Sequence, residues 1–290
     1  MKKFIPESEL IINPDGSIFH LHLHPEQLAD NVILVGDPGR VKTVASFFDE
    51  KECEVENREF KTITGKYKNK RISVVSTGIG TDNIDIVLNE LDALVNIDLK
   101  NRVEKEKTSS LNIIRIGTSG GLQEYVPVGT YVIADKSIGF DGVLNYYAGR
   151  DRICDLDFER NFVESTGYDR SHAAPYVVNA DRELVEKIGR DDMVRGVTIS
   201  ANGFYGPQGR VLRLPLNDPE LNRKISCFEY NGQKITNYEM ESSAIAGLSK
   251  LMGHKAMTVC VIIANRLAGN SNTAYGGSVE NLIETVLERI

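Results

Sequence analysis

The chain has 290 residues, of which 41% are hydrophobic, and a formal net charge of −7. A chain of this length and composition can bury a large core, either as one α/β domain or as two smaller ones. The excess of negative charge argues against a protein whose main task is to grip nucleic acid or an anionic membrane, because either partner requires a dominant basic surface. Any phosphate group that the protein binds must therefore be met by a local cluster of arginines.

Neither the cysteines nor the N-terminus indicates an oxidising compartment or a membrane. Cys53, Cys154, Cys227 and Cys260 are widely separated and lack the spacing of a zinc site, so we expect reduced thiols. Residues 1–9 lack the apolar core of a signal peptide, and no apolar run approaches the roughly 20 residues of a membrane span. The sequence predicts a cytoplasmic protein.

Short apolar runs rich in β-branched residues, typical of strands buried on both faces, recur along the chain. They are residues 31–36, 72–78, 112–117 and 258–263. Residues 83–94 instead carry apolar side chains at helical spacing. Alternating strands and helices predict an α/β sheet with helices on both faces. No Pro/Gly/Ser-rich linker divides the chain, which favours a single domain over residues 1–290.

Two segments fit this pattern less well. Residues 96–110 are strongly charged, and we interpret them as a surface insertion without a catalytic role. Residues 145–172 mix aromatic and charged residues without a clear period, and we expect them to form a mobile excursion over the site.

Two arginines lie next to glycine-rich turns at the carboxyl ends of predicted strands. Ligands bind at these ends in this fold class, so we predict an anion site there. The segment from Gly36 to Arg40 follows a strand and begins a helix, which offers free N–H groups and a positive dipole end, although it is also an ordinary turn. Arg115 lies inside an apolar strand, with Thr118 in the turn that follows. A buried arginine requires either a protein carboxylate or an anionic ligand, and both possibilities stay open. Arg58 is a further candidate, or one half of a surface ion pair.

Two glutamates, Glu239 and Glu241, precede an amphipathic helix that begins near Ala244. If this segment is extended, both side chains point in similar directions, and a buried carboxylate there can accept hydrogen bonds from the vicinal hydroxyls of a ribose. Acidic residues are also favoured in the first turn of a helix. Capping explains one glutamate more easily than the pair.

Residues 204–210, Phe-Tyr-Gly-Pro-Gln-Gly-Arg, form a turn with two polar side chains, Gln208 and Arg210. A carboxamide both accepts and donates hydrogen bonds, whereas a guanidinium only donates. Together they match the edge of uracil, which offers acceptor O4, donor N3–H and acceptor O2. An adenine-type edge would be served poorly, so the turn is a predicted site for a pyrimidine base.

His20, His22 and His24 alternate, so they would share one face of an extended segment. Three histidines on one face can bind a metal, but no carboxylate or cysteine neighbour supports such a site. We therefore expect one functional histidine, two surface histidines and no metal.

In combination these motifs resemble the nucleoside phosphorylase family, which contains the purine nucleoside and uridine phosphorylases, from about Phe19 to Arg266. The resemblance implies a single-domain, three-layer α/β/α fold with a central mixed, partly barrel-like sheet. It also implies a pentosyltransferase that uses inorganic phosphate as co-substrate and needs no cofactor. Attack of phosphate opposite the base would invert C1′, through a transition state of oxocarbenium character as in glycoside hydrolysis.

The resemblance divides the site into three parts and makes a homodimer its minimum unit. The phosphate part would comprise Gly36, Arg40, Arg115 and Thr118, together with Arg58 of the partner subunit. The ribose part would comprise Phe204, Met240 and Glu241, with His20 of the partner subunit at the 5′ end. The base would contact Gln208 and Arg210, and the catalytic residues would be Arg115, Thr118, Glu241 and Arg210.

Several positions distinguish branches of the family. Asn265-Arg266 stands where the purine-specific branch has an aspartate, which favours the uridine branch. The insertion at 96–110 and Gly209 resemble the longer animal forms, and the insertion puts the hexamer of the bacterial enzymes in doubt. Residues 78–83 depart from the bacterial pattern, so no monovalent cation is assumed at the subunit interface.

Uridine is thus the expected substrate. Deoxyuridine and thymidine are left open, because no residue clearly distinguishes ribose from 2′-deoxyribose. The alternatives are a purine phosphorylase, a hydrolase of adenine nucleosides and a non-catalytic nucleoside-binding relative. The phosphate-binding arginines argue against hydrolysis, which does not need them. No nucleic acid or membrane partner is expected.

Overall fold

Four buried strands form the parallel centre of the sheet in a computed structural model that describes residues 4–290. They are β1 (Asn31–Val35), β4 (Lys70–Ser76), β7 (Asn112–Gly121) and β13 (Lys255–Asn265), in the spatial order β13-β7-β1-β4. All neighbouring pairs among them are parallel. The four predicted apolar runs are confirmed as strands. Residues 1–3 of the stretch considered above for a signal peptide lie outside the described part.

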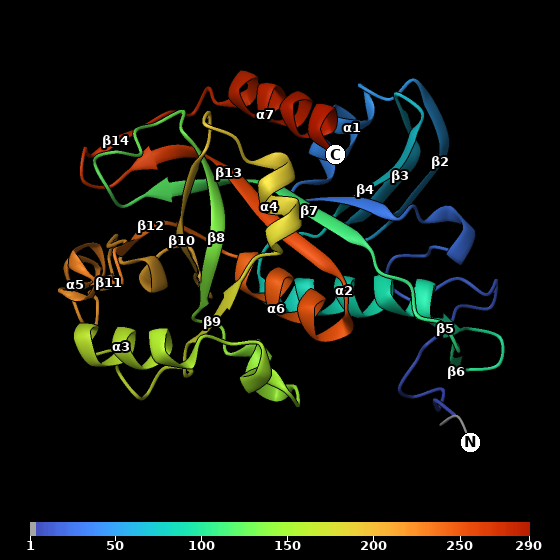
Figure 1. Ribbon diagram of the computed structural model, residues 1–290, viewed down its shortest axis with the longest axis horizontal. Helices are drawn as coiled ribbons and strands as arrows, with labels where there is room; N and C mark the ends of the chain where they lie inside the picture. Colours follow the sequence, from blue (N-terminus) through green and yellow to red (C-terminus); the bar gives the residue numbers. More distant parts are fainter. Residues whose placement is uncertain (1–3) are drawn as a thin grey trace.

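Three further strands turn part of this sheet into a closed barrel. They are β8 (Tyr131–Gly139), β10 (Val194–Ser200) and β12 (Gln233–Glu239). β10 pairs in parallel with β8 and β12, whereas β8 runs antiparallel to β13 and β12 runs antiparallel to β7. The ring β7-β13-β8-β10-β12 therefore closes on itself (Figure 1), which confirms the mixed, partly barrel-like sheet.

The remaining strands extend the edges. β2 (Glu50–Asn57) and β3 (Phe60–Tyr67) continue the sheet beyond β4 with antiparallel pairing. Three short strands are added at the edges. β9 (Tyr176–Asn179) pairs with β8, β11 (Glu229–Tyr230) pairs with β12, and β14 (Asn270–Ser271) pairs with β13. A separate hairpin is formed by β5 (Ile97–Asp98) and β6 (Val103–Glu104).

Helices cover both faces of the sheet (Figure 1), which confirms the three-layer arrangement. One face packs against α1 (Pro38–Ala45), α4 (Arg182–Ile188) and α7 (Gly276–Arg289). The other packs against α2 (Thr81–Asn96), which contains the predicted helix, and α6 (Ser242–Met252). Beside the barrel lie α3 (Leu156–Thr166) and α5 (Leu221–Cys227). The 3-10 helices are η1 (Pro25–Gln27), η2 (Val143–Tyr146), η3 (Arg150–Arg152) and η4 (Gly206–Gln208).

Residues 145–172, expected to lack a regular period and to form a mobile excursion over the site, contain the packed helix α3, so the expected lack of a period is wrong. The Asp155 carboxylate caps this helix by accepting a hydrogen bond from the N–H of Phe158 (3.0 Å). Phe158 and Phe162 are fully buried, with ring centroids 5.5 and 5.4 Å from that of Phe228. The helical period was present in these two rings, but the charged residues between them obscured it.

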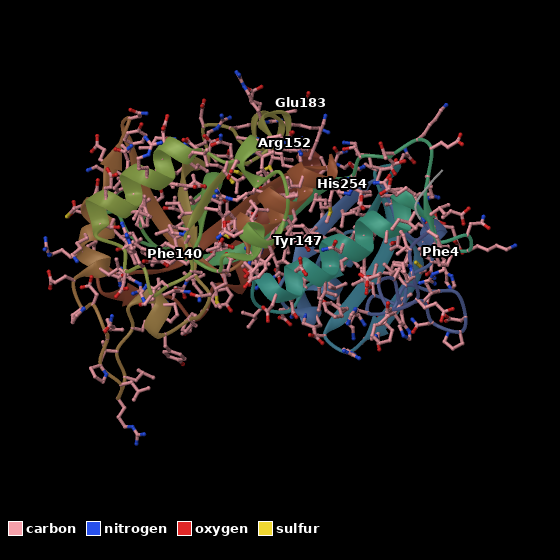
Figure 2. The ribbon with its side chains drawn as sticks, turned by 90° about the horizontal axis from the view of Figure 1, so that it is seen from below. Phe4, Phe140, Tyr147, Arg152, Glu183 and His254 are labelled. Atoms are coloured by element: carbon pink, nitrogen blue, oxygen red, sulfur yellow. The ribbon has the colours of Figure 1, made fainter. Side chains whose placement is uncertain are left out.

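The charged segment 96–110 contains the β5–β6 hairpin and holds the N-terminal segment. The Arg102 guanidinium donates hydrogen bonds to the carbonyl oxygens of Ile5 (2.9 Å), Pro6 (3.1 Å) and Leu10. In return, the Arg102 carbonyl accepts a hydrogen bond from the N–H of Ile5 (2.8 Å). Figure 2 shows Phe4, which begins this segment, at the end of the molecule opposite to Phe140 of the barrel. Within residues 4–290, no helix is both long and apolar enough to cross a membrane.

We expect Arg102→Ala to lower the free energy of unfolding by about 2 kcal/mol, because hydrogen bonds from a charged donor contribute roughly 1.5–3 kcal/mol. Chemical denaturation measures this loss. Lys107→Ala is a suitable control, since Lys107 is an exposed cation of the same insertion. An equal loss in both variants would show that the insertion acts through its charge and not through these contacts.

Candidate active site

A cavity of about 800 Å³ opens where β1, β4, β10 and β12 end. It is lined by most of the predicted site residues: Gly36, Arg40, Arg115, Thr118, Phe204, Gln208, Arg210, Met240 and Glu241. Arg58 and His20 do not line the cavity of their own chain. The structure thus brings together residues from widely separated motifs, as expected for a site at the ends of strands.

Two glycine turns and a helix N-terminus form one end of the cavity. The Gly36 carbonyl accepts a hydrogen bond from the N–H of Gly78 (3.0 Å), which joins the turns after β1 and β4. The Asp37 carboxylate caps α1 by accepting from the N–H of Gly39 (2.8 Å). Pro38, the first residue of α1, lines the cavity, so the positive end of the helix lies at the cavity wall.

Arg40 is the cation of this end that lacks a partner. Among residues 4–290, its half-buried guanidinium forms no hydrogen bond or ion pair. Burial lowers the pKa of Arg40, and the nearby positive charge of Arg115 lowers it further. Two guanidinium groups on one wall repel each other, and an anion bound between them would remove that repulsion.

Arg115 is buried and already held by protein groups. Its Nη2 donates to the Glu241 carboxylate, and its Nη1 lies 3.3 Å from both Glu239 Oε2 and Cys260 Sγ. Burial alone would lower the pKa of Arg115, but Glu241, Cys260 and Glu239 together raise it, so the guanidinium stays charged. A Cβ atom on Gly117 would lie 2.2 Å from Arg115 Nη1, so a side chain there would displace the guanidinium from its partners. Of the two partners that the sequence left open, the structure contains the carboxylates.

The two glutamates have different surroundings. Glu239 accepts hydrogen bonds from the hydroxyls of Ser200 (2.6 Å) and Ser242 (2.7 Å) and from the N–H groups that begin α6. Glu241 accepts one from the N–H of Gly80 (2.8 Å), which ties it to the start of α2. Burial raises the pKa of Glu241 and the charge of Glu239 adds to this, although Arg115 opposes both. Helix capping therefore accounts for Glu239, and Glu241 is the carboxylate available beside Met240.

The other end of the cavity is the loop that contains η4. Gln208 is buried, and its Oε1 accepts a hydrogen bond from Arg210 Nη1 (2.6 Å). The same Nη1 donates to the Phe204 carbonyl (2.5 Å), and the guanidinium lies 3.8 Å from the centre of the Phe204 ring. Burial and the positive charge of Arg266 lower the pKa of Arg210 to about 10. With Gln208 Oε1 engaged, the Nε2 hydrogens of Gln208 and the remaining N–H groups of Arg210 are donors without a partner among residues 4–290.

Arg266 is a second cation near Arg210. In the sequence it served only to distinguish the uridine branch of the family from the purine branch. Its guanidinium lies 5.5 Å from the centre of the Tyr238 ring, and its buried Nη2 has no partner in residues 4–290. The adjacent Asn265 side chain turns away and bonds the carbonyls of Gln123 and Val126 (both 2.9 Å). Asn265 therefore shapes the turn, whereas Arg266 adds positive charge near Arg210. An arginine directly after a buried strand was the signal that could have identified it.

Arg58 and His20 lie together in a patch outside this cavity. Arg58 is exposed in the β2–β3 turn with a φ of 54°, and its guanidinium lies 5.7 Å from the centre of the Phe19 ring. The His20 Nδ1 lies 2.6 Å from Glu90 Oε1, and the His20 carbonyl accepts from Asn57 Nδ2 (2.8 Å). These contacts fix both candidate residues on one surface.

The predicted common face of His20, His22 and His24 is wrong. The chain turns between Ile18 and His22, where the N–H of His22 donates to the Ile18 carbonyl (3.0 Å) and His22 adopts a φ of 53°. His24 instead precedes η1. Across the described residues, no three His, Cys, Asp or Glu side chains are placed to hold a metal ion together.

Comparisons with known proteins agree with this geometry. The model of the phosphorylase superfamily matches residues 30–289. The uridine phosphorylase of Thermococcus kodakarensis is 29% identical over 94% of this chain and 86% of its own length. The DeoD-type purine nucleoside phosphorylase of Brevibacillus brevis is 26% identical over 93% of this chain and 97% of its own.

A solved structure extends the likeness to three dimensions. A Trypanosoma brucei nucleoside phosphorylase, described as showing uridine phosphorylase activity, superposes with a TM-score of 0.87 at 31% identity, covering 97% of this chain and 98% of that one. The match of the family model over residues 30–289, together with the fold and the cavity, establishes that the chain belongs to the phosphorylase superfamily.

Proposed function

We propose that this protein is a uridine phosphorylase, a pentosyltransferase that converts uridine and phosphate into uracil and ribose 1-phosphate with inversion at C1′. One observation carries the proposal: among residues 4–290, the cavity has a cation without a partner, Arg40, at one end and free donors of Gln208 and Arg210 at the other. Glu241 and Met240 lie on the wall between these ends, where a ribose would fit. No cofactor is required, since phosphate itself is the nucleophile.

Arg40, Arg115 and the α1 N-terminus would hold phosphate as a dianion, with the Thr118 hydroxyl donating to it. Attack on C1′ then depends on orientation and electrostatic stabilisation, without a covalent intermediate. Glu241 would accept hydrogen bonds from the ribose hydroxyls and face the developing oxocarbenium character. Its link to Arg115 would couple the placement of ribose to that of phosphate.

Uracil leaves as an anion whose charge is spread over O2 and O4. Gln208 and Arg210 would donate to these atoms most strongly when the glycosidic bond is nearly broken, and only such a strengthening accelerates the reaction. Arg266 would add positive charge at the same end, because it lies close enough to lower the pKa of Arg210. The loop from Phe204 to Arg210 thus favours a pyrimidine.

The proposed unit is a cytoplasmic homodimer. Each chain would supply Arg58 and His20 to the cavity of the partner subunit, Arg58 at the phosphate and His20 at the ribose 5′ end. Their common patch, outside their own cavity and fixed by Glu90 and Asn57, supports this arrangement.

The test is to incubate the protein with uridine, with and without phosphate, and to follow uracil and ribose 1-phosphate. We expect turnover only with phosphate and equal amounts of both products. Release of uracil without phosphate would identify a hydrolase and would contradict the roles of the arginines. A panel of deoxyuridine, thymidine, inosine and adenosine then sets the specificity, and binding without turnover of any nucleoside would indicate a non-catalytic relative.

A further inference from the structure

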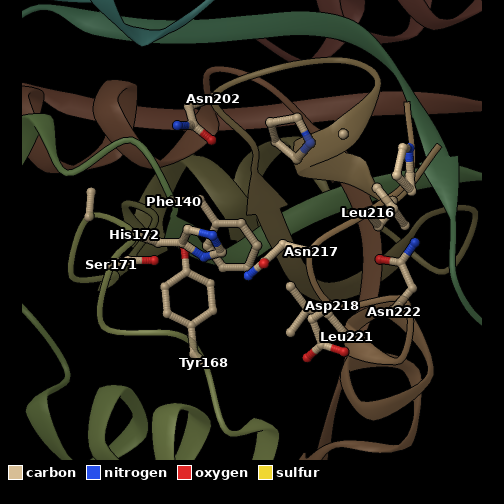
Figure 3. Close-up of a pocket in the computed structure, with 15 residues that line it drawn as sticks. Phe140, Tyr168, Ser171, His172, Asn202, Leu216, Asn217, Asp218, Leu221 and Asn222 are labelled. Atoms are coloured by element: carbon tan, nitrogen blue, oxygen red, sulfur yellow. The ribbon is translucent and has the colours of Figure 1, made fainter. Parts of the chain in front are cut away.

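The loop from Phe204 to Arg210 lines the active-site cavity on one side and a second cavity of about 490 Å³ on the other. Figure 3 shows the residues that line the second cavity. Gln208 lines the first cavity, whereas its neighbours Pro207 and Gly209 line the second. Asn222 of α5 also lines the second cavity and not the first, on the side opposite Tyr168 in this view. Asn222 therefore contacts the loop from the face that the nucleoside does not reach.

Both ends of the Asn222 carboxamide are bonded to residues that line the active site. Its Nδ2 donates to the backbone carbonyl of Gln208 (3.0 Å), and its Oδ1 accepts from the Tyr238 hydroxyl (3.0 Å). Tyr238 is buried in β12, the strand that ends at Glu239, and burial raises the pKa of Tyr238, so the phenol stays a donor. Asn222 thereby links the position of Gln208 to a strand of the barrel.

The loop is shaped to admit this contact. Gly209 has a φ of 68°, and a Cβ atom at this position would lie 2.0 Å from Asn222 Nδ2. Glycine therefore serves both the left-handed conformation and the close approach of the carboxamide. The other hydrogen bonds of the turn are local, from the N–H groups of Gln208 and Arg210 to the Tyr205 carbonyl (3.1 and 2.8 Å). They fix the shape of the turn but not its place on the barrel.

We propose that Asn222 is a positioning residue that sets the specificity of the base end by holding Gln208 at the cavity wall. The proposal rests on the proposed role of Gln208 in base binding. Asn222 does not line the active-site cavity, so its loss would act through Gln208 and Tyr238, the two residues that its carboxamide bonds. The proposed phosphate residues lie on other elements, and Phe204 is the one proposed ribose residue of this chain that belongs to the loop, so phosphate and ribose would be bound nearly as before.

The test compares Michaelis constants in both directions of the reaction. We expect Asn222→Ala to raise KM for uridine and for free uracil about tenfold, as for the loss of roughly one well-placed hydrogen bond, with KM for phosphate and ribose 1-phosphate changed about twofold or less. Asn222→Asp keeps the acceptor for Tyr238 but sets a carboxylate against the Gln208 carbonyl, so it should raise the uridine KM at least as much. Asn217→Ala, which removes another carboxamide of the second cavity, should leave all four constants unchanged.

Equal rises in all four constants, or no rise for uridine and uracil, would overturn the proposal. If Asn222→Ala does not fold, Tyr238→Phe is used instead, because it removes only one of the two hydrogen bonds. The same comparison applies: KM for uridine and uracil should rise, and KM for phosphate and ribose 1-phosphate should not. Failure of the proposed function is recognised separately, because wild-type protein would then not cleave uridine. The Michaelis constants would then be compared with whichever nucleoside of the panel the protein cleaves. If it cleaves none of these nucleosides, both proposals are rejected.

Discussion

Replacement of Arg210 by alanine is expected to lower kcat/KM for uridine by roughly two to three orders of magnitude, as for the loss of one oxyanion-hole donor worth about 3 kcal/mol. The variant would lose the proposed donor to the departing base, and it also loses the bonds that Arg210 makes to Gln208 and Phe204. Steady-state kinetics measures the effect, which should fall mainly on kcat because these bonds strengthen as uracil leaves.

Two further variants separate charge from geometry at this position. Arg210→Lys keeps the charge but not the planar fork, so its loss should be intermediate. Arg213→Ala removes an exposed cation three residues further along the chain and should leave the rate unchanged. If Arg210→Ala raises only KM, Arg210 contributes uniform binding, and stabilisation of the leaving base must come from other groups.

Local sequence patterns identified those parts of the fold and site that depend on local physics. Near-continuous apolar runs predicted the central strands, because a strand buried on both faces has no polar side to display. The turns at Gly36 and Gly78 were found by their glycines. Gln208 and Arg210 were singled out because a carboxamide and a guanidinium match the hydrogen-bonding edge of uracil; both line the cavity, and their contact with a base stays a prediction. None of these inferences required knowledge of what packs against the segment.

The errors and omissions concern contacts between distant segments. The pairing of Arg115 with Glu239 and Glu241 joins residues more than 100 positions apart. The burial of Phe158 in α3 depends on Phe228. In the turn that replaces the expected extended segment at His22, the N–H groups of His20 and Leu21 donate to the distant Glu90 carboxylate (3.0 and 2.8 Å). Each case was decided by tertiary packing, which overrides a weak local signal.

The buried cluster of Arg115, Glu239 and Glu241 leads to the largest expected loss of stability. Arg115→Met would leave two buried carboxylates close together without a cation, and removal of one partner of a buried pair costs roughly 3–5 kcal/mol. Urea denaturation should show this loss, and phosphorolysis should be abolished. Lys255→Met is the matched control, because Lys255 pairs with Glu183 at the surface, where such a pair contributes about 0–1 kcal/mol.

A compensated variant distinguishes the structural role of Arg115 from its catalytic role. With Glu239→Gln and Glu241→Gln added to Arg115→Met, no unpaired charge remains in the cluster, so most of the lost stability should return. Activity should not return, because a refolded site still lacks the guanidinium and the carboxylate that face phosphate and ribose. If stability fails to recover, the packing around Gly117 and Cys260, and not the charge balance, is what makes Arg115 indispensable to the fold. If activity recovers with stability, neither the Arg115 guanidinium nor the carboxylates of Glu239 and Glu241 are needed for the reaction, and the buried cluster serves the fold alone.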